Sequence, residues 1–497
     1  MRALSAPLEI LTVAEMTRAD RQAVEGGASQ EELMERAGGA VATAVSERFS
    51  PRPTVVLAGP GNNGGDGYVV ARLLAERGFD VRLEALAPPK AAAAVAAAHQ
   101  WRGETRALSE PKKGELVIDA LFGAGLDRPL APEVARLARA LEKGGAEVVA
   151  VDVPSGVSGD AGRPLGDVSF RAALTVTFHR LKPAHVLQPG RGLCGEVVVG
   201  DIGLGESRSN LFANAPELWS ARFPWPSLTA HKHSRGRLIV VSGEAWSTGA
   251  ARLSARAGLR IGAGLVTILS PPEALMINAA HLEAVMLKPF ETELELEAAA
   301  SQAEAVVIGP AAGVSEATLS NVLALARTGA ALVIDADGLT VFRDEPEELF
   351  SALDRDDVLT PHPGEFERVF PGLLGKSPER ITAAREAAAR AGAVVLLKGP
   401  DTVIASPDGR AAVNVDGSRW LATAGSGDVL SGFIGGLVAQ GMESFEAACA
   451  AAFIHGACGE RFGPGLISED LPGLAPRVLN ELWSESPGRP ERQKSRP

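Results

Sequence analysis

Hydrophobic and polar positions in the first two hundred residues alternate between short β-branched runs and longer stretches rich in Ala, Leu and Arg. Between the first four runs these stretches are long enough for helices, a pattern typical of βαβ units around a mainly parallel, buried sheet. Ahead of the sheet, residues 14–28 and 30–48 have helical periodicity. The expected strands are PTVVLAG (53–59), VRLE (81–84), ELVIDALFG (115–123), EVVAVDVPSG (147–156), LTVTFH (174–179) and EVVVGDIG (196–203).

The alternation stops after Gly205, where prolines, serines and basic residues interrupt any periodicity, and it resumes at residue 236. We therefore expect two α/β domains, 1–215 and 225–485, with a disordered tail after Ser484. The small and apolar residues of 427–456 predict a buried helix pair, as core or as interface. The expected strands of the second domain are GRLIVVSG (236–243), AGLVTILS (263–270), AVVIGPAAG (305–313), ALVIDADGL (331–339), DVLTPHPGEF (357–366), AVVLLKG (393–399) and TVIASPDG (402–409).

Composition and net charge limit the kinds of molecule that this chain is expected to bind. The chain has 497 residues, enough for two full cores, and its net charge of −12 argues against nucleic acid or anionic membrane, which call for basic patches. No CxxC spacing points to a zinc site or a disulfide framework, and no apolar run approaches the ~18 residues that span a bilayer. We expect a cytoplasmic homo-oligomer whose partners are small molecules, with no nucleic acid and no membrane. The cysteines are Cys194, Cys449 and Cys458.

A glycine-rich motif, GPGNNGGDG at 59–67, follows the first expected strand. Its glycines allow a backbone that turns successive N–H groups toward a phosphate, and a helix predicted at 67–77 adds the positive end of its dipole. Asn62, Asn63 and Asp66 are polar groups that this loop would direct at a ligand. The alternative is a turn that only packs strand against helix, although two amides and an acid exceed what packing requires.

Two further strand ends carry an aspartate, in DALFGAGLDRP (119–129) and DVPSG (152–156). Asp119 and Asp152 are each as consistent with capping a turn as with a ligand role. In a doubly wound sheet, however, both ends meet the glycine-rich loop at one crevice. The three ends together predict a binding site.

Together with LMERAG at 33–38, these motifs resemble the NAD(P)H-hydrate epimerase family over about residues 10–205. The resemblance implies a Rossmann-like three-layer domain in which Asp152 acts as the acid–base group beside C6 of the hydrated nicotinamide. It also implies a potassium ion held by Asn63, Asp119 and Ser155. The implied contacts to substrate phosphates and ribose are Asn62, Asn63, Gly64, Gly65, Asp66, Gly123, Ala124, Gly125, Leu126, Asp127, Arg128 and Pro129.

A second anion-binding motif, AGSGD at 424–428, follows the strand-like SRWLAT and precedes a helix. Its N–H groups would face a transferring phosphoryl group, and Asp428 is placed to accept a proton from the attacking hydroxyl. The alternative is a loop in which Asp428 caps the helix. Other candidates are KGPDT (398–402), where Lys398 could hold a phosphate or be solvated, TPHPGEFER (360–368) around His362, and DADGL (335–339), whose aspartates line a cleft or cap a turn.

These motifs, with HKHSRG at 231–236, resemble the ADP-dependent NAD(P)H-hydrate dehydratase family of the ribokinase-like superfamily over about residues 225–480. The resemblance implies that His362 and Asp428 contact the hydrated nicotinamide and that magnesium accompanies ADP. The family's GPGLG reads GPAAG at 309–313, so Ala311 replaces a glycine, and Gly313 is carried over as a substrate contact. The implied nucleotide contacts are Lys398, Gly399, Pro400, Asp401, Thr402 and Gly427.

The two resemblances together predict a bifunctional enzyme that epimerises hydrated NADH and NADPH at C6 and dehydrates one epimer. Phosphorylation of the C6 hydroxyl would turn hydroxide, a poor leaving group, into phosphate. One rival is a kinase for a hydroxymethyl vitamin precursor fused to a nucleotide-binding module. A rival from another class is a metabolite-sensing or scaffold protein.

Overall fold

The computed structural model describes residues 8–376, 379–415 and 417–485. The chain divides into two compact units, 1–211 and 212–497. The tail for which disorder was predicted lies, beyond Glu485, outside the described residues. Within these described ranges, no helix combines the length and apolarity needed to cross a membrane.

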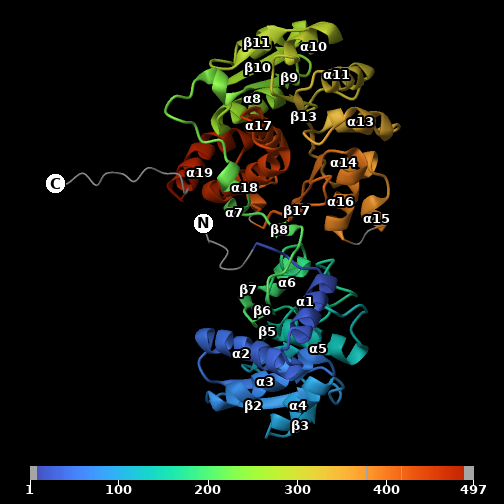
Figure 1. Cartoon of the computed structure of the whole chain (residues 1–497), viewed down its shortest axis with the longest axis vertical. Helices are drawn as coiled ribbons and strands as arrows, with labels where there is room; N and C mark the ends of the chain where they lie inside the picture. Colours follow the sequence, from blue (N-terminus) through green and yellow to red (C-terminus); the bar gives the residue numbers. More distant parts are fainter. Residues whose placement is uncertain (1–7, 377–378, 416, 486–497) are drawn as a thin grey trace, which may run out of the picture. The chain divides into compact units, whose positions relative to one another are not determined.

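The first unit contains a seven-stranded, all-parallel sheet in the order β3-β2-β1-β4-β5-β6-β7 (Figure 1). The core on one face joins α2, α3 and α4 to the sheet, and the core on the other face contains α5, which gives the three layers expected of a Rossmann-like domain. The strands are β1 (Pro53–Ala58), β2 (Asp80–Ala85), β3 (Thr105–Ala107), β4 (Leu116–Ala120), β5 (Glu147–Val151), β6 (Leu174–Phe178) and β7 (Glu196–Gly200). The helices are α1 (Val13–Glu25), α2 (Gln30–Arg48), α3 (Asn62–Glu76), α4 (Ala92–Gln100), α5 (Pro132–Gly144), the short 3₁₀ helix η1 (Pro183–His185) and α6 (Gly190–Cys194).

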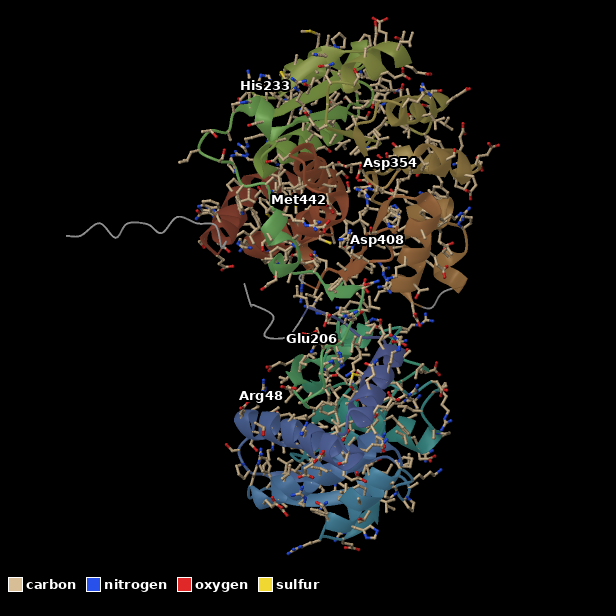
Figure 2. All side chains as sticks on the ribbon, viewed as in Figure 1. Arg48, Glu206, His233, Asp354, Asp408 and Met442 are labelled. Atoms are coloured by element: carbon tan, nitrogen blue, oxygen red, sulfur yellow. The ribbon has the colours of Figure 1, made fainter. Side chains whose placement is uncertain are left out.

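The lead-in helices are confirmed, and both begin at a capping box, in which side chain and backbone at the helix start bond each other reciprocally. Arg48, which Figure 2 labels, lies near the end of α2 and forms an ion pair with Glu196 of β7 at 2.6 Å. This pair ties the helix to the edge strand. No residue of α1 is buried, so this helix lies on the surface of its unit.

The prediction that the helix after the glycine-rich motif starts at 67 was wrong, because α3 begins at Asn62. Most of the motif is therefore the first turns of a helix rather than a loop. A Cβ at Gly64 would lie 1.8 Å from the Gly59 carbonyl oxygen, and one at Gly65 would lie 2.6 Å from the Met34 side chain. These two glycines allow α3 to pack closely against its neighbours.

The second unit contains a ten-stranded mixed sheet in the order β11-β10-β9-β12-β13-β14-β15-β16-β17-β8. The pairs from β11 to β15 are parallel, and β16 is antiparallel to both of its neighbours, β15 and β17. The strands are β8 (Leu211–Ala213), β9 (Arg237–Val241), β10 (Leu265–Ser270), β11 (Met286–Pro289), β12 (Ala305–Ile308), β13 (Ala331–Ile334), β14 (Val358–Leu359), β15 (Val394–Leu397), β16 (Val403–Ala405) and β17 (Ala411–Val413).

The helices of this unit follow the strand–helix alternation, and the last ones pack together. They are α7 (Pro216–Trp219), α8 (Gly249–Ile261), α9 (Pro272–Ala279), α10 (Glu293–Ala300), α11 (Glu316–Ala326), α12 (Asp337–Thr340), α13 (Pro346–Ala352), α14 (Pro363–Val369), α15 (Leu373–Lys376), α16 (Arg380–Ala391), α17 (Ser426–Ala439), α18 (Ser444–Phe462) and α19 (Leu471–Glu485).

The buried helix pair predicted at 427–456 is confirmed as α17 and α18, and both belong to the core of this unit. Gly432 and Gly436 let α17 approach α8, since a Cβ at Gly432 would lie 2.2 Å from the Ser254 carbonyl oxygen. The strand-like reading of SRWLAT was wrong, because Arg419–Leu421 form a 3₁₀ helix. Packing in this unit fixes the start of α17, where Asp428 lies.

Candidate active sites

A cavity of about 840 Å³ opens at the carboxyl ends of β1, β4 and β5 in the first unit. It brings together most of the residues predicted for the first site, while Gly64, Gly65 and Pro129 do not line it, and Asp119 and Ser155 are fully buried. Two further groups on its wall, Asp20 and Lys182, were not predicted, because neither lies in a recognisable motif. The predicted residues on the wall are Asn62, Asn63, Asp66, Gly123, Ala124, Gly125, Leu126, Asp127, Arg128 and Asp152.

Asp152, which follows β5, is held by three donors. Lys182 Nζ lies 2.9 Å from Oδ1, the Thr177 hydroxyl donates to Oδ1 at 3.0 Å, and the N–H of Ala124 donates to Oδ2 at 2.8 Å. Lys182 is only 2% exposed and also donates to Thr177 Oγ1 at 2.8 Å. Burial alone would raise the pKa of Asp152, but Lys182 and the other donors outweigh it and lower the pKa to about 2. Asp152 is therefore a fixed carboxylate.

The backbone of Asp152 is also fixed. Its φ of 68° is unusual for a residue with a side chain, and its carbonyl oxygen accepts a hydrogen bond from His185 Nε2 at 2.9 Å. His185 Nδ1 in turn accepts from the Lys182 N–H at 2.9 Å, which assigns the ring proton to Nε2. Burial and Lys182 lower the pKa of His185 to about 4, so this ring is a neutral support rather than a charge.

The cavity wall also carries Asp20, Asp66 and Asp127, and the pKa is raised for the first two. Asp66, on α3, is 9% exposed, and burial together with the charges of Asp152 and Asp20 raises its pKa well above the ordinary value. Burial also raises the pKa of Asp20, with Lys182 acting against it and Asp152 adding to it. The cavity thus holds a carboxylate with a lowered pKa beside two carboxyl groups whose pKa values are raised.

The residues implied for potassium suit a monovalent cation. The fully buried Asp119 accepts hydrogen bonds from the Ser155 hydroxyl at 2.6 Å and from the Ser155 N–H at 2.8 Å. Burial raises its pKa to about 6 against these bonds, and no described cationic side chain pairs with it. Asn63 Nδ2 is buried without a hydrogen-bond partner among the described residues, but it is a donor, so only Asn63 Oδ1 could ligate a cation. Oxygen donors around an uncompensated buried carboxylate fit a cation of this kind.

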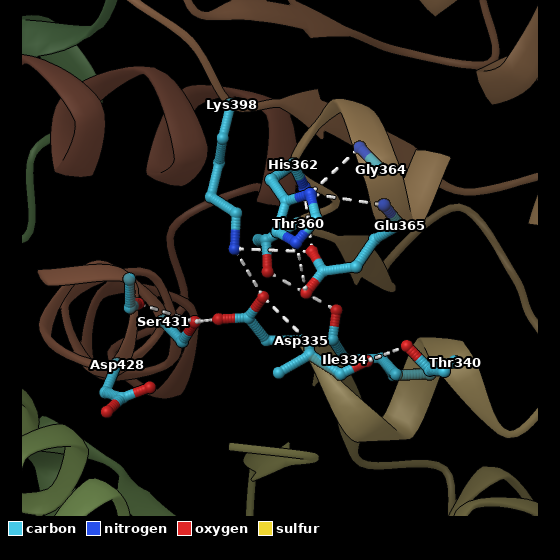
Figure 3. Close-up of polar contacts among 12 residues, drawn as sticks. Ile334, Asp335, Thr340, Thr360, His362, Gly364, Glu365, Lys398, Asp428 and Ser431 are labelled. Atoms are coloured by element: carbon cyan, nitrogen blue, oxygen red, sulfur yellow. Dashed lines mark hydrogen bonds and ion pairs between the residues drawn. The ribbon is translucent and has the colours of Figure 1, made fainter. Parts of the chain in front are cut away.

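The second site lies where α14, β13, β15 and α17 meet (Figure 3). Lys398 Nζ pairs with Asp335 Oδ1 at 2.7 Å and lies 3.7 Å from Glu365 Oε2. The Ser431 hydroxyl donates to Asp335 Oδ2 at 2.8 Å. Burial alone would lower the pKa of Lys398, but Asp335 and Glu365 raise it, so the amine is charged. Asp335 Oδ1 also accepts a hydrogen bond from the Ala336 N–H at 2.9 Å, so this carboxylate both binds Lys398 and caps the turn after β13.

Asp428 lies in the first turn of α17, beside this network but without a direct ion pair among the described residues. Burial and the charge of Asp335 raise its pKa to about 6, with Lys398 acting in the opposite direction. The Ser254 hydroxyl donates to its carbonyl oxygen at 2.8 Å, which anchors the helix start. A Cβ at Gly427 would lie 3.4 Å from Lys398 Nζ, so this glycine faces the same cleft.

His362 is the N-cap of α14, and its Nδ1 accepts from the N–H groups of Gly364 and Glu365 at 2.9 and 3.2 Å. Nε2 therefore carries the proton and lies 3.3 Å from Glu365 Oε1. Half of the His362 side chain remains exposed. The residue thus has a structural role in capping, and half of its side chain remains accessible.

Hydrogen bonds within the KGPDT turn and from Arg380 hold its backbone in place. Thr402 Oγ1 accepts from the Gly399 N–H at 3.2 Å, and Arg380 donates to the Lys398 carbonyl oxygen at 3.2 Å. Asp401 is 2% exposed and lies 3.4 Å from Arg380 Nε, so its carboxylate faces the protein, whereas Pro400 is exposed.

Gly313 lies in a turn shaped by unusual backbone angles. Its φ is 83° and its N–H donates to Asp337 Oδ2 at 2.9 Å, while Ala311 adopts a φ of 53°. Ala311 therefore keeps the left-handed backbone that a glycine would adopt more easily. A cavity of about 740 Å³ lies beside this turn, with Gly243, Ala312 and Ser315 among its lining residues.

Fold and sites together define a two-site enzyme, in which a Rossmann-like domain with a carboxylate–lysine centre is joined to a ribokinase-like domain with an anion-binding helix start. Residues 238–467 match the family model described as NAD(P)H-hydrate dehydratase, and residues 30–184 match the model described as YjeF-related protein N-terminus. The bifunctional NAD(P)H-hydrate repair enzyme Nnr of Thermofilum pendens is 38% identical over 522 residues, covering 96% of this chain and 97% of that protein. The chain therefore belongs to the bifunctional NAD(P)H-hydrate repair enzymes, which confirms the predicted family.

Among solved structures, a ribokinase-like superfamily protein from Enterococcus faecalis V583 covers 56% of this chain and 98% of its own, with a TM-score of 0.50 and 21% identity. This likeness shows the fold of the second unit. The ADP/ATP-dependent NAD(P)H-hydrate dehydratase from Bacillus subtilis, co-crystallised with ATP and Mg²⁺, covers 54% of this chain at 27% identity and a TM-score of 0.48.

Proposed function

We propose that this chain repairs hydrated NADH and NADPH with the two sites described above. The first domain interconverts the R and S hydrates at C6, and the second removes water from the S hydrate with ADP, giving NAD(P)H, AMP and phosphate. The observation that carries the proposal is the pair of aspartates in opposite electrostatic settings, Asp152 fixed as a carboxylate and Asp428 with a pKa raised to about 6. Asp152 and Asp428 therefore suit proton transfers in two different reactions, one in each domain.

In the first site, Asp152 removes the proton of the C6 hydroxyl. Its carboxylate is oriented by Lys182, Thr177 and Ala124, so it needs no rearrangement before reaction. The N–H groups of the first turn of α3, at Asn62, Asn63 and Gly64, have no partner within the helix and are the binding groups for the substrate diphosphate. Asn63, Asp119 and Ser155 would hold potassium, which supplies the positive charge that the buried Asp119 otherwise lacks.

In the second site, Asp428 accepts the proton of the C6 hydroxyl as that oxygen attacks the terminal phosphoryl group of ADP. A base with a pKa near 6 is ionised at neutral pH and still accepts a proton readily. Lys398 and the N–H groups at the start of α17 bind the phosphates. Magnesium, when bound with ADP, neutralises charge on those phosphates. The electron pair of the ring nitrogen then expels phosphate to leave an iminium between N1 and C6, and loss of a proton from C5 restores the dihydronicotinamide.

The test is recovery of dihydronicotinamide absorbance from a mixture of both C6 epimers of hydrated NADH with ADP and Mg²⁺. The wild type is expected to restore all of the absorbance, and Asp428→Ala none. Recovery of only the S share would contradict the epimerase assignment. A stable phosphorylated product without recovery would instead identify a small-molecule kinase.

A further inference from the structure

We propose that Asp20, on α1, is the second proton-transfer group of the epimerase site and works opposite Asp152. The proposal rests on the proposed epimerase function and deepens it. The family model begins at residue 30, so α1 lies outside the matched segment.

The geometry begins with α1 itself. One face of this helix, with residues three or four positions apart, lines the cavity that also contains Asp152 and Lys182. The helix is held there at its start, because the Val13 N–H donates to Asp160 Oδ1 at 2.8 Å and the Leu11 N–H donates to the Leu181 carbonyl oxygen at 2.9 Å. The residues on this face are Met16, Thr17, Asp20, Arg21 and Val24.

The charged groups around Asp20 come from several elements. Asp66 on α3, Asp152 after β5 and Lys182 after β6 lie on the cavity wall, as do Arg21 of α1 and Arg128 of the loop after β4. Burial and the charge of Asp152 raise the pKa of Asp20, while Lys182 acts in the opposite direction. Lys182 is already committed to Asp152, so the nearest cation stabilises Asp152 as a carboxylate rather than Asp20. The two groups are therefore poised as acid and base.

Inversion at C6 through ring opening needs both Asp152 and Asp20. When Asp152 removes the C6 hydroxyl proton, the oxygen forms a carbonyl, the bond from C6 to the ring nitrogen breaks, and its electron pair goes to that nitrogen. The nitrogen then takes a proton from Asp20. In the reverse direction Asp20 recovers this proton, the nitrogen attacks the other face of the aldehyde, and Asp152 returns a proton to the oxygen. The cycle consumes nothing and inverts C6.

Asp66 is less suited to this exchange. It is 9% exposed, and burial raises its pKa well above the ordinary value, so its carboxyl group is less accessible to the substrate than that of Asp20. Asp20 is only partly buried and lies on a surface helix, where its carboxyl group can meet the substrate.

The experiment follows R and S interconversion of hydrated NADH without ADP, with the spontaneous rate subtracted. We expect Asp20→Asn to lower kcat about 100-fold with KM within twofold of wild type. Asp20→Glu should recover part of that loss. Glu25→Gln, which removes an exposed carboxylate from the same helix outside the cavity, should match wild type.

An unchanged KM shows that the Asp20→Asn site still folds and binds. The proposal is overturned if Asp20→Asn keeps kcat within threefold of wild type, or if its loss lies entirely in KM. If the wild type itself does not accelerate interconversion, the epimerase function fails and this proposal fails with it. Dehydration of the S epimer by the same variants reports separately on the second domain and should not change.

Discussion

Asp152 and Asp428 have a lysine near them in both domains, yet their pKa values move in opposite directions. Lys182 Nζ bonds Asp152 directly at 2.9 Å, and the pKa of Asp152 falls to about 2. Lys398 Nζ bonds Asp335 instead, at 2.7 Å, and the pKa of Asp428 rises to about 6. The comparison teaches that the direct partner of a lysine, rather than its presence in a site, decides whether the pKa of a neighbouring carboxyl group falls or rises.

The largest expected effect follows from removing the base of the second site. Asp428→Asn keeps the shape of the side chain but cannot accept the hydroxyl proton, so dehydration of the S epimer should fall by about 10³- to 10⁴-fold. The epimerisation rate of the same variant is the control and should stay at the wild-type value. Dehydration within tenfold of wild type would show that Asp428 is not the base.

A smaller but still large effect is expected when Asp152 loses its cation. Lys182→Met leaves a mostly buried carboxylate without its partner, so the pKa of Asp152 should rise and epimerisation should slow by about 100-fold. The pH profile of epimerisation decides the cause. In the variant its acid limb should move to higher pH, whereas a merely structural defect would lower the rate equally at every pH.

The two settings also predict different pH dependences in the wild type. Asp428 must be ionised to act, so dehydration should fall about tenfold for each pH unit below 6. Asp152 remains ionised there, because its lowered pKa keeps the carboxylate charged until the pH approaches 2. The stability gained from its ion pair is likewise complete above about pH 4, the unfolded value, and is lost as pH falls through 2. Dehydration that stays constant from pH 7 to 5 would contradict the raised pKa of Asp428.

The sequence predicted the repeating strands and the motif aspartates well, because period and glycine spacing are local signals. It missed the short strands β3, β8, β11 and β17, whose sequences TRA, LFA, MLKP and AAV contain no run of β-branched residues. It placed the start of α3 too late, since glycines and asparagines resemble a loop until packing requires them in a helix.

The sequence did not predict which side chains surround or pair with these aspartates. Lys182 lies 30 residues beyond Asp152 in a segment without a motif, and Asp20 lies on a helix whose face is defined only by the cavity. The role of Asp335 was left open, because a strand-end aspartate caps turns as often as it binds a lysine. Such pairings depend on tertiary contacts that periodicity does not encode.

The smallest predicted effect tests how Asp335 keeps Lys398 away from Asp428. The Ser431 hydroxyl donates to Asp335 Oδ2 at 2.8 Å, so Ser431→Ala removes one bond that orients this carboxylate. We expect the free energy of unfolding to fall by about 1 kcal/mol and dehydration to fall less than tenfold. Ser351→Ala, which removes an exposed hydroxyl bonded only to its own helix turn, is the matched control. If the acid limb of dehydration shifts to lower pH in Ser431→Ala alone, Lys398 has turned toward Asp428, and competition between the two aspartates for one lysine sets the pKa of the base.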